Sequence, residues 1–165
     1  MLAAHISEKN PQISPLMPVL NSPLLSIHVA VIMMSYALFA LIMLNSAAAL
    51  TLHHFTRSCS DWVENSALAG RIVLYPAVFL LTAGIFIGAV WANVSWGRYW
   101  GWDPKEVWAL ITMLIYATAL HSRSLRYFNR PVFLHWFAML AFLSVLFTYF
   151  GVNYFLGGMH SYGAA

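Results

Sequence analysis

Four long apolar stretches constrain the fold of this chain more than any other feature. They cover residues 24–50, 72–94, 107–125 and 132–156. Each is close to the roughly 20 residues that an α-helix needs to cross a lipid bilayer. Proline precedes three of them, at Pro23, Pro104 and Pro131, where it suits the first turn of a helix. We therefore expect an all-α polytopic membrane protein, with an irregular N-terminal arm over 1–22 and a four-helix transmembrane domain over 23–165.

The composition agrees with this expectation. Of the 165 residues, 61% are hydrophobic and 8% are charged, whereas charged residues make up about 25% of a soluble domain. The formal charge of +3 is not gathered into a basic run, which argues against nucleic-acid binding. Cys59 is the single cysteine, so thiol chemistry must use the thiols of another molecule.

Four crossings place the two ends of the domain and its central loop on one membrane face. His28 starts the first stretch, and His160 follows the fourth. Both should therefore share a face with the loop between the second and third stretches. His121 lies near the far end of the third stretch, roughly 20 Å deeper at 1.5 Å per residue.

The distribution of basic residues predicts the orientation. The loops around 51–71 and 122–131 carry five arginines, and the other side carries Lys9, Arg98 and Lys105. Basic residues are enriched in cytoplasmic loops. We therefore expect a multi-pass protein of the inner (plasma) membrane, with the central loop on the extracytoplasmic face.

The central loop contains an unusual density of tryptophan. Its core reads WGRYWGWDPKEVW over 96–108, and five of the seven tryptophans lie close together: Trp91, Trp96, Trp100, Trp102 and Trp108. One interpretation is an aromatic belt at the lipid headgroups. The other is a platform for a large planar ligand, since indoles offer flat apolar area with a polar N–H. Arg98 and Lys105 would then pair with acidic groups of the ligand, while Asp103 and Glu106 cap the third helix.

Histidine suggests what the ligand is. Two imidazoles, from His28 and His160, would converge beside the aromatic loop, and paired histidines commonly bind the two faces of a haem iron. Zinc fits less well, because no cysteine or third clustered histidine completes a tetrahedral set. An ionisable residue within a span, such as His121, is a functional candidate, although a structural hydrogen bond is the alternative. For His135 we favour the structural alternative.

In the second stretch, Gly84 and Gly88 form a GxxxG pattern that lets another helix approach closely.

Three segments carry a resemblance to a known family. They are WGRYWGWDPKEVWALITMLIYATALHSR at 96–123, SPLLSIHVAVIMMSYALFAL at 22–41 and FTYFGVNYFLGGMHSYG at 147–163. The sequence resembles the membrane subunit of System II cytochrome c synthases, the CcsA (ResC) family within the haem-handling WWD superfamily. The resemblance covers the C-terminal portion of that family's members.

The resemblance implies a function and a set of residues. His28 and His160 look like the external axial ligands of haem b, and His121 looks like the histidine of an internal haem site. The loop looks like the WWD loop that holds haem, through Trp91, Trp96, Arg98, Trp100, Trp102, Asp103 and Trp108. The activity implied is export or presentation of haem and its covalent attachment to the CxxCH motif of apocytochrome c, as a holocytochrome c synthase (haem lyase) subunit. A companion CcsB (ResB) subunit would be the partner, and no catalytic residue is assigned.

Two other functions remain compatible with the residues. A b-type cytochrome that transfers electrons would also use paired histidines, but usually deep in the helix bundle beside a quinone site. A non-catalytic scaffold or transporter subunit would use the tryptophans only as a belt. Covalent haem on a co-expressed apocytochrome separates the proposed activity from both.

Overall fold

The computed structural model describes residues 22–55, 60–121 and 124–156. His160, Cys59 and residues 1–21 of the N-terminal arm lie outside these residues. In the described part every regular element is helical, so the predicted all-α class is confirmed. The elements are α2 (Pro23–Phe55), α3 (Ser60–Trp96), α4 (Pro104–Leu120), the 3₁₀-helix η2 (Arg126–Asn129), α5 (Pro131–Leu146), the π-helix η3 (Phe147–Gly151) and α6 (Val152–Phe155).

Three of the helical segments are long and apolar enough to cross a membrane. They are Pro23–Phe55, Asp61–Trp96 and Pro131–Phe155. The remaining predicted span, the third, corresponds to α4, whose 17 residues extend about 25 Å, near the lower limit for a crossing. The chain is therefore a multi-pass helical membrane protein.

Two predicted boundaries differ from the structure. Residues 51–71 were expected to form a loop, but α2 continues to Phe55 and α3 begins at Ser60. No proline or glycine interrupts the chain over 51–55, so the helix continues past the apolar stretch. The third span was expected to reach residue 125, but α4 ends at Leu120 with His121 as its C-cap. The length of an apolar stretch indicates which residues can lie in the lipid, but it does not indicate the residue at which the helix ends.

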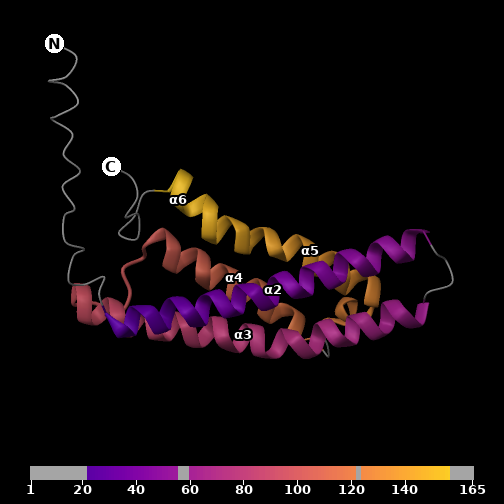
Figure 1. Ribbon diagram of the computed structural model, residues 1–165, viewed down its shortest axis with the longest axis horizontal. Coiled ribbons are helices and arrows are strands. Elements are labelled where there is room, and N and C mark those ends of the chain that lie inside the picture. The colour runs from indigo at the N-terminus through magenta and orange to yellow at the C-terminus, as the bar shows by residue number, and fades with distance from the viewer. Residues whose placement is uncertain (1–21, 56–59, 122–123, 157–165) are drawn as a thin grey trace, which may run out of the picture.

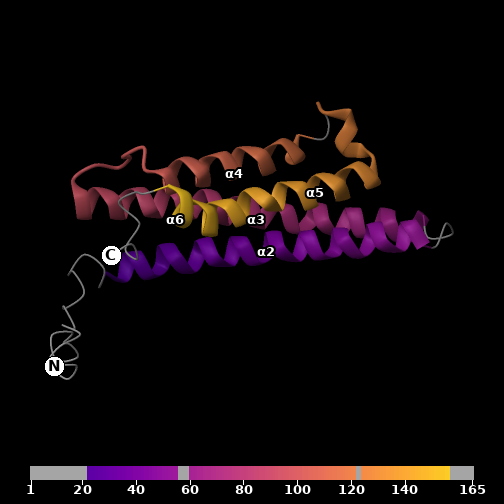
Figure 2. The same cartoon turned by 90° about the horizontal axis from the view of Figure 1, so that it is seen from above.

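The helices run along one long axis in an up-and-down arrangement (Figure 1). α2 and α3 form the longest antiparallel pair and pack most extensively on each other. α4 lies along α3, and α5 lies against α2, α3 and α4 (Figure 2). The start of α2, the end of α3, the start of α4 and α6 lie at one end of the bundle (Figure 1). This arrangement confirms that His28 and the Trp-rich loop share an end.

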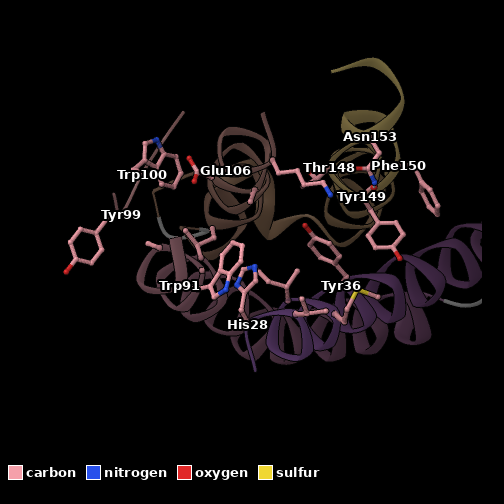
Figure 3. Close-up of a pocket in the computed structure, with 18 of the residues that line it drawn as sticks. His28, Tyr36, Trp91, Tyr99, Trp100, Glu106, Thr148, Tyr149, Phe150 and Asn153 are labelled. Carbon is pink, nitrogen blue, oxygen red and sulfur yellow. The ribbon is translucent and has the colours of Figure 1, made fainter. Parts of the chain in front are cut away.

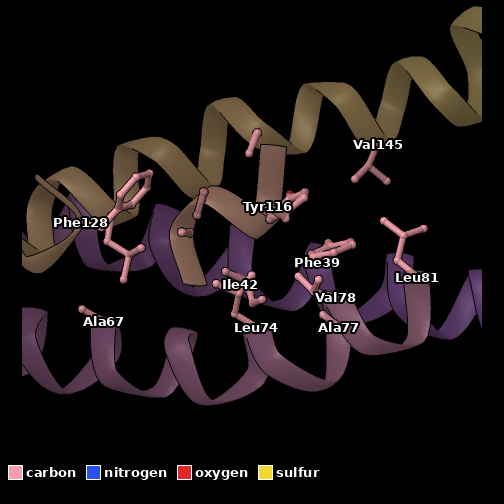
Figure 4. Close-up of a cluster of buried hydrophobic side chains, with 14 residues drawn as sticks. Phe39, Ile42, Ala67, Leu74, Ala77, Val78, Leu81, Tyr116, Phe128 and Val145 are labelled. Carbon is pink, nitrogen blue, oxygen red and sulfur yellow. The ribbon is translucent and has the colours of Figure 1, made fainter. Parts of the chain in front are cut away.

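The interior is apolar and joins all four long segments (Figure 4). At its centre Phe39 of α2 stacks on Tyr116 of α4, with ring centroids 3.8 Å apart and planes inclined by 17°. Large apolar side chains also cover the outside, for example Phe79, Phe86 and Val94 of α3. Outward-facing apolar side chains are expected where lipid, rather than water, surrounds the bundle.

His135 contributes a polar contact to this interior. It is 1% exposed, and its Nδ1 lies 3.1 Å from Ser46 Oγ on α2. Its Nε2 lies 3.2 Å from both Ser66 Oγ and the Val63 carbonyl on α3. A buried polar group needs such partners. The structural interpretation of His135 is therefore confirmed, since its ring ties α5 to α2 and α3.

Candidate functional site

A cavity of about 500 Å³ opens at the end of the bundle that carries the Trp-rich loop. Its volume is within the range of about 300–1,000 Å³ that ligand-binding pockets occupy. The cavity brings together segments that are far apart in the chain (Figure 3). Its walls include His28 and Tyr36 of α2, Trp91 of α3, Trp100 of the loop, Lys105 of α4 and Tyr149 of η3.

His28 is held against α3. Its Nδ1 donates a hydrogen bond to the carbonyl oxygen of Gly84, at 2.8 Å. The ring lies over Gly88 of the same helix, where an added Cβ would come within 2.6 Å of it. The predicted close approach at the GxxxG pattern is therefore confirmed, and α2 is the helix that approaches. His28 and Trp91 lie next to each other in the cavity (Figure 3).

The five clustered tryptophans divide into two groups. Trp91 and Trp100 line the cavity. The other three brace them or lie outside. Trp96 packs edge-on against Trp91, with centroids 4.8 Å apart. Trp102 is 75% exposed and meets Trp100 edge-on at 6.0 Å. Trp108 packs against Phe147 at 4.2 Å.

A capping box fixes the loop to the start of α4. The side chain of Asp103 accepts a hydrogen bond from the Lys105 N–H at 3.1 Å, and Asp103 is buried. Glu106 accepts from the N–H groups of Gly101 and Asp103, at 2.8 and 3.2 Å. The predicted capping roles of both acidic residues are confirmed. In addition, Trp102 adopts a φ of 56°, which is costly for a bulky residue and shows how tightly the loop is turned.

The two basic residues of the loop region lie in different places. Lys105 lines the cavity, whereas Arg98 is exposed and lies outside the lining. Lys105 occupies the first turn of α4, ahead of the apolar stretch that begins at residue 107. Burial lowers the pKa of Lys105, and the negative charge of Asp103 partly offsets this effect. The structure thus places Lys105, but not Arg98, in the wall of the cavity.

His121 lies at the opposite end of the bundle. It is the C-cap of α4 and is exposed, and its Nδ1 donates to the Ala117 carbonyl at 2.8 Å. The length of α4, about 25 Å, separates His121 from the loop. His28 and His121 therefore lie at opposite ends of the bundle, and the predicted convergence of His160 on His28 falls outside the described residues.

Sequence reasoning missed the side of the cavity formed by the end of the last span. Thr148, Tyr149, Phe150 and Asn153 line it, and Tyr149 meets Tyr36 edge-on with centroids 6.5 Å apart. The π-helix η3 (Phe147–Gly151) provides most of this wall, and Asn153 belongs to α6. A π-turn inserts one extra residue and changes which side chains face inward, and such turns are frequent at functional sites. No periodicity in the sequence indicates it, although the segment was part of the family resemblance.

The fold and the cavity define a class: a multi-pass helical membrane protein with a histidine- and tryptophan-lined cavity at one end. The comparisons with known proteins make this more specific. Residues 1–160 match the family model described as cytochrome C assembly protein, so the chain belongs to the cytochrome c assembly protein family.

Several relatives have similar sequences. The protein NrfI of Wolinella succinogenes is 40% identical over 166 residues, which cover 98% of this chain and 18% of that protein. The cytochrome c biogenesis protein CcsA of Chlamydomonas reinhardtii is 42% identical over 92% of this chain and 44% of its own length. CcsA of Gloeobacter violaceus is 54% identical over 51% of this chain and 25% of its own length. The chain thus spans less than half the length of these three relatives.

Proposed function

We propose that this chain binds haem b in the cavity and presents it, at the extracytoplasmic face of the inner membrane, for covalent attachment to the CxxCH motif of apocytochrome c. The observation that carries the proposal is the meeting of His28, Trp91 and Trp100 in one cavity of about 500 Å³. An imidazole and two indoles match an iron porphyrin, which is planar and apolar and takes nitrogen ligands. Membership of the cytochrome c assembly family supports the same ligand.

Residues in and around the cavity have different roles in this proposal. His28 is one axial ligand of the iron, and His160, as the resemblance implies, is the other. Trp91 and Trp100 cover the ring and exclude water. Lys105 pairs with the carboxylates of the haem propionates, because an ammonium that is partly removed from water is stabilised by an opposite charge. Trp96, Trp102, Trp108 and the Asp103 cap act indirectly, by holding the other tryptophans and the loop in place. Arg98 lies outside the cavity and has no contact with haem in this proposal.

The chain contributes position rather than reactive groups. A thioether forms when the S–H of a substrate cysteine adds across a haem vinyl group, and both reacting groups come from haem and apocytochrome. Holding haem at a fixed depth and angle beside the incoming thiols is what accelerates such a reaction. His121, at the other end, serves an internal haem site shared with a CcsB-type subunit.

Absorbance of the purified, full chain tests the axial ligation. We expect a six-coordinate haem spectrum that His28→Ala and His160→Ala each abolish and that added imidazole restores. His53→Ala is the matched control, because His53 lies in the last turn of α2 at the opposite end and should leave the spectrum unchanged. Identical spectra in all four proteins would contradict the proposal.

Co-expression tests the activity itself. The chain, a CcsB-type partner and an apocytochrome c reporter should together give covalent haem on the reporter, detected by haem staining after denaturing electrophoresis. His28→Ala should abolish that signal. Reversible reduction of bound haem by quinol, with no covalent product, would instead favour an electron-transfer cytochrome.

A further inference from the structure

Gly84 and Gly88 do more than allow α2 and α3 to pack closely. Both contact the His28 ring, Gly84 through its carbonyl oxygen and Gly88 through its lack of a side chain. The carbonyl oxygen of Gly84 can only accept a hydrogen bond, so the His28 Nδ1 that lies 2.8 Å away must carry a proton. In the neutral ring, the lone pair is then on Nε2. A histidine that ligates a metal through one nitrogen usually donates its other N–H to a carbonyl or carboxylate in this manner.

Gly88 is what allows the ring to reach that carbonyl. In an α-helix the carbonyl of residue 84 points toward residue 88, one turn further on. A Cβ at Gly88 would lie 2.6 Å from Cε1, 2.8 Å from Nδ1 and 3.3 Å from Nε2 of His28. All three contacts are with the imidazole itself. An alanine at this position would therefore push the ring away from the Gly84 carbonyl.

The two other helical glycines of α3 behave differently. A Cβ at Gly84 would meet the Ile32 side chain, at 2.5 Å from Cδ1 and 2.9 Å from Cγ1, and would not touch the imidazole. A Cβ at Gly70 would find only ordinary contacts, 3.7 Å from Asn45 and 3.9 Å from Ile42. The direct contact with the imidazole is therefore specific to Gly88 among these three.

We propose that Gly88 and the Gly84 carbonyl are positioning groups for the axial ligand, which hold the His28 ring in one orientation with Nε2 directed to the haem site. This inference rests on the proposed function, since it takes His28 to be a ligand. It predicts that a single methyl group at residue 88 disables ligation without removing the histidine.

Titration of the purified chain with haemin tests the inference. Gly88→Ala should weaken haemin binding by about ten- to hundredfold, which is typical for loss of a group that orients a ligand, and imidazole should restore the six-coordinate spectrum. Gly70→Ala, the same change on the same helix, should stay within about twofold of wild type. Equal losses in the two variants would show that the effect is general helix packing.

A double variant separates ring positioning from folding. Once His28→Ala has removed the ring, adding Gly88→Ala should cause no further loss of affinity, because the two changes affect one contact. If Gly88→Ala alone does not fold, the double variant should fold, since the space is then open. A double variant that loses further affinity, or that also fails to fold, would overturn the inference.

The haem-free protein provides a readout that does not depend on ligand binding. Nitrogen-15 NMR of labelled histidine should show His28, identified by its loss in His28→Ala, with the proton on Nδ1 in wild type and a mixture of tautomers in Gly88→Ala. A proton on Nε2 in wild type would overturn the inference. A wild type with the expected tautomer but no His28-dependent haem spectrum would instead contradict the proposed function alone.

Discussion

Among single residues, the two basic side chains of the loop region, Arg98 and Lys105, should differ in their effect on haemin affinity. Lys105 lines the cavity, whereas Arg98 is exposed outside it. Lys105→Met should weaken haemin binding by about tenfold, because a hydrogen bond to a charged group is worth about 1.5 kcal/mol or more. Arg98→Met should change it by less than about twofold. Fluorescence quenching by haemin measures both, and a porphyrin without carboxylates should bind all variants equally.

The same lysine predicts a pH dependence with a definite sign. Burial lowers the pKa of Lys105, so its positive charge is present at low pH and is lost as pH rises through a value below that of an exposed lysine. Affinity for haemin should therefore fall at moderately alkaline pH in wild type. Lys105→Met should lack this step, and an identical step in Lys105→Met would assign it to another group.

The environment of Tyr116 leads to a prediction about the stability of the protein and not about haem binding. Its ring is 1% exposed and stacks on Phe39, but its hydroxyl has no hydrogen-bond partner among the described residues. A buried hydroxyl without a partner costs about 1–3 kcal/mol, so Tyr116→Phe should leave the free energy of unfolding unchanged or raise it. Tyr116→Ala should lower it by about 3–5 kcal/mol. Thermal unfolding in detergent measures both, and strong destabilisation by Tyr116→Phe would reveal a partner for the hydroxyl.

Among the helices and their caps, Asp103 supports the cavity indirectly, because it caps the start of α4. Its side chain caps α4 and is not part of the cavity lining. Asp103→Ala should destabilise α4 by about 1 kcal/mol and loosen the loop, whereas Asp103→Ser should remain near wild type, since serine is also a good N-cap. In each variant, the free energy of unfolding and the affinity for haemin should change together. If Asp103→Ser keeps its stability but loses affinity, Asp103 contacts the ligand directly.

The elements also show which features the sequence can predict. Proline at Pro23, Pro104 and Pro131, the acidic cap at Asp103 and the glycine pair on α3 are local signals, and each gave a prediction that the structure confirms. The π-turn at the end of α5, which brings Tyr149 into the cavity, has no local signal because it depends on packing between α4 and α5. The division of the tryptophans is also a tertiary property, since spacing places them all in one region but does not say which rings face inward.

Across the molecule as a whole, the two ends of the bundle differ in their number of basic residues, and this difference predicts the orientation in the membrane. The cavity end carries Arg98 and Lys105, while the described part of the opposite end carries Arg71, Arg126 and Arg130. Arg71 donates a hydrogen bond to the Phe128 carbonyl and so secures the turn before α5. Because basic residues are enriched on the cytoplasmic side, the cavity should face outward.

A matched pair of tyrosines tests this orientation. Tyr99, at the cavity end, is 61% exposed, and Tyr127, at the other end, is 66% exposed. In a Cys59→Ser background, Tyr99→Cys should react with a membrane-impermeant maleimide in intact cells, and Tyr127→Cys should react only after permeabilisation. The opposite pattern would place the cavity in the cytoplasm. Haem would then be held away from the compartment in which the proposed attachment occurs, and the attachment step, though not haem binding, would have to be abandoned.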